Sequence, residues 1–343
     1  MKSLKIILTQ CLAAVIMLGF AELSMAQDEA RGEAIQLYNQ AQEMAGQNQL
    51  DQAITLYRDA LSVARENELT DIVDLIEERL PRIYGTRASR AYQQYQSERS
   101  MEAINTAIEY FQESQEVAEE FGNDQVAQQA RGAVPQLIYV RSVLHFRQEN
   151  YEEALADLNR ALELNPNYAV AQYQKAIVMK RMEPSDVEGW LAQFDRAIEI
   201  AQQTNNTQAL NNARENAAEE LVFRAVNLSE ERQFSRAIEL LNRARNYNES
   251  SHNIPYRLAE IANKRANWSD AESHARESLE LHNGGVSDKA KIYFELGTAL
   301  KGQGNFEAAC SAFENARYGD FTEPANHELQ FELKCEGHSA SGR

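Results

Sequence analysis

A few residues of this chain have types and spacings that suggest chemistry. His274 and His282 are eight residues apart, so they can share one face of a helix, as two imidazole ligands of a metal site do. A single pair of this kind lies on a solvated surface more often than in a metal site, and we therefore expect no metal and no cofactor. Carboxylate pairs such as Glu152-Glu153 and Glu219-Glu220 are typical of solvated faces in an acidic helical protein.

Sequence motifs for catalysis are absent. The chain contains no HExxH, GxSxG, GxxxxGK or EF-hand loop, and no GxGxxG at a strand-to-helix turn. We therefore predict that this protein is not an enzyme. Its net charge of −18, from 34 basic and 52 acidic residues, makes nucleic acid an unsuitable partner. Two explanations of this charge stay open: a solvated acidic surface, or a groove for a basic partner or for divalent cations.

A repeated helix-turn-helix pattern occupies residues 218–323. Its first copy places small residues at Ala225 and Ala237, where two helices must touch, and an aromatic residue, Phe234, at the turn between them. The second copy follows 34 residues later, and the third after four extra residues. The corresponding residues are Ala259, Trp268 and Ala271 in the second copy, and Gly297, Phe306 and Ala309 in the third. One such pair cannot bury its apolar face, so neighbouring copies must stack.

This order of small, aromatic and aliphatic positions resembles the tetratricopeptide repeat. The stretch ENYEEALADLNRALELNPNY, with Tyr151, Ala154 and Pro166, carries the same pattern upstream. The resemblance implies an all-α, right-handed α-solenoid of stacked antiparallel helix pairs over residues 27–323. About seven repeats are expected, at 34–67, 84–117, 135–168, 169–204, 218–251, 252–285 and 290–323. Residues 324–343 are expected to form a capping helix and tail.

Several departures from the pattern carry their own expectations. The spacing between some copies stretches, which indicates longer helices with polar turns near Asn67 and Asn205. Pro81 and Pro135 are expected to start or kink helices. Trp190 stands where a small alanine is usual, which puts the local helix crossing in doubt.

The first 26 residues are typical of a secretory signal peptide. Lys2 and Lys5 precede an apolar run that ends in small residues before Gln27. We expect cleavage after Ala26, no integral membrane segment afterwards, and an exported protein. The combination is similar to exported bacterial tetratricopeptide proteins, which implies the periplasm, with an extracellular location as the alternative.

Two cysteines, Cys310 and Cys335, remain after removal of this segment. In an oxidising compartment an even pair favours a disulfide, which would pin the C-terminal cap. The alternative is two unpaired thiols.

The resemblance also implies a concave groove lined by the first helix of each repeat, which accepts peptides or partner segments. Aromatic residues recur on the face that would line it, with basic residues beside them. The predicted partner-binding set is Tyr38, Tyr92, Tyr139, Phe146, Arg147, Tyr173, Lys180, Arg181, Tyr256, Arg257, Phe294 and Lys301. The alternative is that these aromatic rings pack against neighbouring repeats. The clamp that some family members use for a partner's C-terminal carboxylate is incomplete here, because Val222, Phe223 and Val226 occupy part of it.

We therefore expect a non-enzymatic scaffold or adaptor of the cell envelope, with a protein or peptide partner bound in the groove. Two alternatives remain. One is a self-assembling structural protein, and the other is an adaptor that binds peptidoglycan or another carbohydrate through its aromatic stripe.

Overall fold

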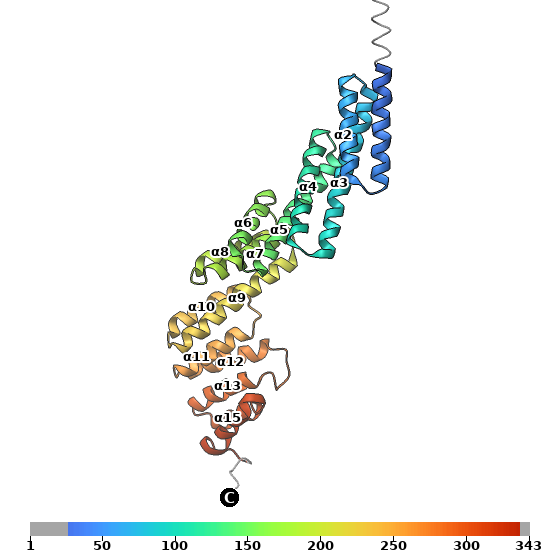
Figure 1. Cartoon of the computed structure of the whole chain (residues 1–343). Helices are drawn as coiled ribbons and strands as arrows, with labels where there is room; N and C mark the ends of the chain where they lie inside the picture. Colours follow the sequence, from blue (N-terminus) through green and yellow to red (C-terminus); the bar gives the residue numbers. More distant parts are fainter. Residues whose placement is uncertain (1–26, 337–343) are drawn as a thin grey trace, which may run out of the picture. The chain divides into compact units, whose positions relative to one another are not determined.

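The computed structural model describes residues 27–336, and every regular element in that range is helical (Figure 1). The expected signal peptide therefore lies outside the described residues. The chain divides into two compact units, Met1–Ser185 and Asp186–Arg343. This boundary falls in the turn after α7, so the two helices of the repeat expected at 169–204 belong to different units.

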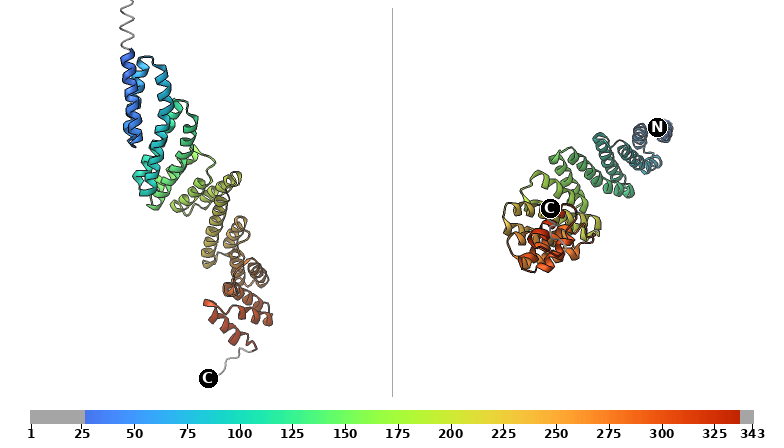
Figure 2. Two further views of the ribbon diagram at one scale, coloured as in Figure 1. Left: turned by 90° about the vertical axis from the view of Figure 1, so that its right-hand side faces the viewer. Right: turned by 90° about the horizontal axis from the view of Figure 1, so that it is seen from below.

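The first unit is a series of helices that pack in sequence order as antiparallel neighbours (Figure 2). Residues 27–46 are helical. The helices that follow are α2 (Leu50–Glu66), α3 (Thr70–Glu98), α4 (Met101–Glu120), α5 (Asp124–Arg147), α6 (Tyr151–Leu164) and α7 (Ala169–Met182).

The second unit continues the same arrangement. Its helices are α8 (Val187–Gln203), α9 (Thr207–Glu230), α10 (Phe234–Tyr247), α11 (Asn253–Lys264), α12 (Trp268–Leu281), α13 (Ala290–Gly302) and α14 (Phe306–Asn315). In addition to each consecutive pair, α9 contacts α11 and α11 contacts α13. The first helices of successive repeats therefore lie side by side. Stacked antiparallel helix pairs make both units all-α, and the predicted fold class is confirmed.

Small residues allow the paired helices to approach closely. Ala225 of α9 and Ala237 of α10 are both fully buried, as are Ala259 and Ala271 at the corresponding positions of the next pair. A Cβ atom added to Gly297 would lie 2.8 Å from the Phe313 ring, so the last pair leaves no room for a side chain there. The repeated small positions thus fix where helices touch.

Left-handed residues make the tight turns within the pairs of the second unit. Arg232, Ala266 and Gly304 have φ values of 60°, 57° and 79°. This conformation ends one helix and reverses the chain within a few residues. Glycine adopts it without a steric penalty, which explains Gly304.

The longest helices of the described chain exceed what the repeat requires. α3 has 29 residues, and α5 and α9 have 24 residues each. They account for the stretched spacing seen in the sequence. Pro81 and Pro135 are buried inside α3 and α5. The prediction that they start helices is therefore wrong.

Trp190 replaces a small residue without leaving the core. Its side chain on α8 is 1 % exposed and contacts the Phe194 ring edge-on at 6.1 Å. The Arg224 guanidinium of α9 lies 5.3 Å from the centre of the indole. The helix pair α8–α9 therefore accommodates the large ring between its members.

The C-terminal segment covers the last repeat. It consists of α15 (Thr322–His327) and a π-helical turn (Glu328–Glu332), and its Ala325 and Leu329 are fully buried against a core that includes Phe313. Cys335 is also buried, and a disulfide joins it to Cys310 of α14, with the two Cα atoms 6.0 Å apart. This segment closes the apolar face that a terminal repeat would otherwise expose.

Candidate functional site: a groove on the first helices of the second unit

A groove of ≈ 890 Å³ runs along the face formed by α9, α11 and α13. We call it the α9–α11 groove. Its lining residues are Glu215, Ala218, Glu219, Val222, Phe223, Val226, Asn227, Glu230, Asn248, Ser251, His252, Asn253, Arg257 and Lys291. The first helices of successive repeats contribute most of them, because these helices lie side by side.

The α9 side of the groove presents an exposed aromatic ring. Phe223 is 61 % exposed, whereas the adjacent Val222 is 7 % exposed and packs into the core. Val226 follows on the next turn of the helix and is partly buried. An exposed phenyl ring with valines around its base is the kind of apolar anchor that partner proteins cover.

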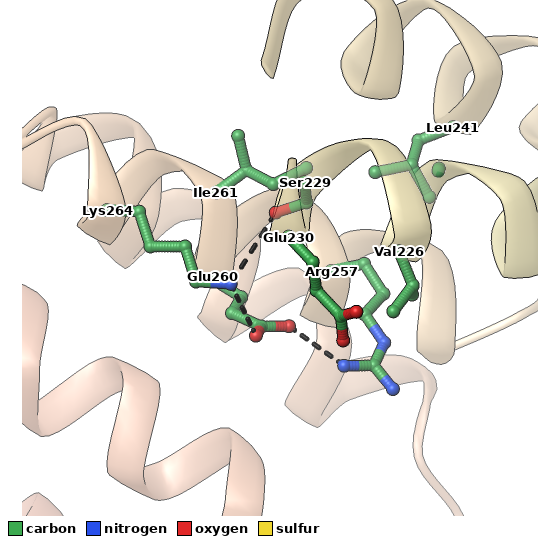
Figure 3. A pocket seen from close by; sticks show the side chains of 9 residues that line it. Val226, Ser229, Glu230, Leu241, Arg257, Glu260, Ile261 and Lys264 are labelled. Carbon is green, nitrogen blue, oxygen red and sulfur yellow. Dashed lines mark hydrogen bonds and ion pairs between the residues drawn. The ribbon is translucent and has the colours of Figure 1, made fainter. Parts of the chain in front are cut away.

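The α11 side of the groove is held by ion pairs. Glu260 accepts hydrogen bonds from Arg257 at 2.9 Å and from Lys264 at 3.0 Å (Figure 3). Burial alone would raise the pKa of Glu260, but these two bonds outweigh it and hold that pKa below its usual value. Lys264 also donates to Ser229 of α9 at 3.5 Å, which ties the two helices together.

A recess of ≈ 50 Å³ opens between these residues and α9. Its walls combine Val226, Leu241 and Ile261 with the charged side chains of Glu230, Arg257 and Lys264 (Figure 3). A space of this size holds one or two water molecules or the tip of a side chain. The recess therefore adds depth to the groove without forming a separate ligand pocket.

A buried polar pair lies beside these ion pairs. Asn263 of α11 donates from Nδ2 to the Glu295 carboxylate of α13 at 2.7 Å, while its own Oδ1 is buried without a hydrogen-bond partner in the described structure. Burial raises the pKa of Glu295 to about 7. The contact between α11 and α13 thus contains a carboxylate that can change its charge near neutral pH.

The predicted aromatic residues of the first unit pack mainly against other rings. Three of them contact another tyrosine edge-on or tilted: Tyr38 with Tyr57 at 5.4 Å, Tyr139 with Tyr168, which precedes α7, at 5.4 Å, and Phe146 with Tyr151 at 5.6 Å. Tyr92 stacks on Tyr95 at 6.2 Å. Tyr173 and Lys180 are partly buried on α7, and Arg147 and Arg181 are exposed at helix ends.

In the second unit the predicted residues lie in different environments. Arg257 lines the α9–α11 groove, but Tyr256 is only 6 % exposed and belongs to the core. Phe294 lies between the rings of Phe313 and Phe321. Lys301 forms ion pairs with Glu328 at 2.6 Å and Glu332 at 3.2 Å, which fasten the C-terminal cap to α13.

Sequence reasoning missed Phe223 as a groove residue. Valine at position 222 breaks the series of aromatic residues, and the aromatic ring occurs one position later. That shift of one residue turns the side chain by about 100° around the helix, out of the core and toward solvent. The signal in the sequence was an aromatic residue, Phe223, one position after the position where aromatic residues recur.

Stacked helix pairs with a lined groove define a helical-repeat scaffold of the protein-interaction type. Residues 143–168 and 290–316 match models of the tetratricopeptide repeat, and the chain therefore contains repeats of this kind. Such repeats generally form non-catalytic scaffolds that bind proteins. No protein of curated function matches the chain.

Several solved structures share parts of this arrangement. YrrB, described as a TPR protein with an unusual peptide-binding site, is 19 % identical, with 55 % of this chain and 86 % of that chain covered at a TM-score of 0.32. A tetratricopeptide repeat protein from Parabacteroides merdae is 14 % identical, with 88 % and 98 % covered at a TM-score of 0.28. Yeast Tom70 is 14 % identical, with 89 % and 88 % covered at a TM-score of 0.31.

Within 27–336, no helix is long and apolar enough to cross a membrane. The same part of the chain contains no group of three or more potential metal ligands, and His274 instead lies 3.6 Å from the Glu277 carboxylate.

Proposed function

We propose that this protein is a non-enzymatic adaptor that binds a segment of a partner protein in the α9–α11 groove. One observation carries the proposal: Phe223 is 61 % exposed at a groove of ≈ 890 Å³, although most large apolar side chains of the second unit are buried. Covering such a ring removes apolar surface from water and stabilises a complex.

The expected aromatic stripe supports this proposal only in part. The rings of Tyr256 and Phe294 stabilise the repeats, as the packing alternative expected, while Arg257 remains in the groove. We therefore propose Phe223, Val226 and Arg257 as the contact residues.

Peptide selection tests the proposed groove. A library of random short peptides is selected on the immobilised chain, and the binders are measured against Phe223→Ala and Phe306→Ala. Phe306 is a matched control because it is 57 % exposed on α14, outside the groove. We expect Phe223→Ala to weaken binding at least about tenfold and Phe306→Ala to leave it unchanged. Equal binding by both variants would show that the groove is not the site.

We further propose that the adaptor is exported and works in the periplasm. The charged, apolar and small-residue segments of positions 1–26 support export, as does the pairing of Cys310 with Cys335. A mature chain that starts at Gln27 in the envelope fraction is the expected result of N-terminal mass spectrometry. A chain that keeps Met1 in the cytoplasmic fraction would contradict export.

A further inference from the structure

Three carboxylates of the α9–α11 groove have no partner. Glu215, Glu219 and Glu230 are exposed on α9, and all three line the groove. None of them forms a hydrogen bond or ion pair with another residue in the range 27–336. They share the face of α9 that carries Phe223, because the spacings of four, four and seven residues match helical turns.

Two other carboxylates close to these three are paired. Glu220 of the same helix accepts from Arg224 at 3.0 Å, and Glu260 on the opposite side binds both Arg257 and Lys264. The groove side of α9 thus carries three carboxylates without a partner among the described residues. Glu215 and Glu219, one turn apart, repel each other, and cations from a partner would relieve that repulsion.

Two cations, Arg257 and Lys291, line the opposite side of the groove, and each has a contact within the protein. Arg257 pairs with Glu260, and the Lys291 ammonium lies 4.7 Å from the centre of the Tyr256 ring. Three carboxylates on the α9 side of the groove thus face Arg257 and Lys291 on the other side, and the negative charge lies along α9. The net charge of the whole chain, −18, has the same sign and would attract a basic partner over a longer range.

We propose that the occupant of the α9–α11 groove is an extended basic segment of a partner protein, with an apolar side chain on Phe223 and Lys or Arg on both sides of it. This inference rests on the proposed function and specifies the class of partner. Such a partner is one of the two explanations of the acidic composition.

The geometry of α9 sets the spacing of this segment. Glu219 lies about 6 Å and Glu230 about 10 Å from Phe223 along the helix axis, at 1.5 Å per residue. An extended chain advances about 3.3 Å per residue. In a partner segment that runs along α9, one basic residue therefore stands about two positions from the apolar residue on one side. The other basic residue stands about three positions away on the other side.

Three designed peptides in a Gly/Ser background test this class. The first has a central Leu with Lys at those two positions, the second replaces both Lys by Glu, and the third replaces Leu by Ser. Fluorescence anisotropy with the purified chain should show binding of the first peptide only. Raising the salt concentration should weaken this binding, since the carboxylates are exposed to solvent.

Charge-removing variants complete the test. Glu219→Gln/Glu230→Gln should weaken the Lys peptide by about five- to tenfold at low salt, whereas Glu280→Gln/Glu307→Gln, exposed on α12 and α14, should not. Helical circular dichroism confirms that each variant is folded. Equal affinity for the Lys and Glu peptides, or an unchanged affinity in Glu219→Gln/Glu230→Gln, would overturn the basic class. If binding of the selected peptides then still depends on Phe223, the proposed groove stands. If their binding does not depend on Phe223, the proposed function fails as well.

Discussion

The side-chain NH2 group of Asn263 on α11 donates to both the main-chain carbonyl oxygen and the side-chain carboxylate of Glu295 on α13, at 2.9 and 2.7 Å. The bond joins the first helices of two successive repeats at the groove face. The Oδ1 atom of Asn263 is buried without a hydrogen-bond donor in the described structure. This pair links the packing of the repeats to pH.

Glu295→Gln should raise stability at high pH only. Burial raises the folded-state pKa of Glu295 from 4.5 to about 7, so the protonated form stabilises the fold fully below pH 4.5 and this contribution is lost as the pH rises through 7. Gln stays neutral and keeps both hydrogen bonds. We expect the variant to exceed the wild type by about 1–2 kcal/mol at pH 8 and to match it near pH 4.5.

Urea unfolding at several pH values measures this difference. Glu280→Gln, exposed on α12, is the control. Its free energy of unfolding should differ from that of the wild type by the same amount at every pH. His252 also responds to pH, because burial and the nearby His282 lower its pKa, so the wild type loses stability as His252 protonates below about pH 6.5. That contribution cancels between wild type and variant. A constant difference between Glu295→Gln and wild type would contradict the assignment.

Gly302→Ala should destabilise the second unit. A Cβ atom at Gly302 would lie 2.3 Å from the Trp268 indole, which is a heavy-atom clash. We expect a loss of about 1–3 kcal/mol in the free energy of unfolding, typical of overpacking. Gly132→Ala in α5 is the matched control, since nothing lies within 4 Å of its added Cβ and alanine favours the helix.

Thermal unfolding compares the two glycine variants. Gly302→Ala should melt below the wild type and Gly132→Ala at or above it. Equal melting temperatures would mean that the Trp268 ring moves aside without cost.

Reduction should loosen the C-terminal cap. The bond between Cys310 and Cys335 closes 25 residues, so its removal should cost roughly 3 kcal/mol of unfolding free energy. Alkylation before and after reduction should differ by two thiols. Cys310→Ala/Cys335→Ala should show no response to a reducing agent, and a wild type that is equally insensitive would contradict the bond.

The sequence by itself determined the helices, their pairing and the turns. The spacing of small residues such as Ala225 and Ala237 requires close helix contact, and that requirement is local to one repeat. The extra length of α3 and α9 could also be predicted, because polar turns near Asn67 and Asn205 precede them.

The tertiary structure alone decided which side chains remain available. Tyr256 and Phe223 are both aromatic residues on first helices, yet one is 6 % and the other 61 % exposed. Helical periodicity gives the direction of a side chain around its own axis, but only the stacked neighbour determines whether that direction is covered. The packing of α9, α11 and α13 therefore forms the groove. The same packing determines which of its carboxylates have a hydrogen-bond partner.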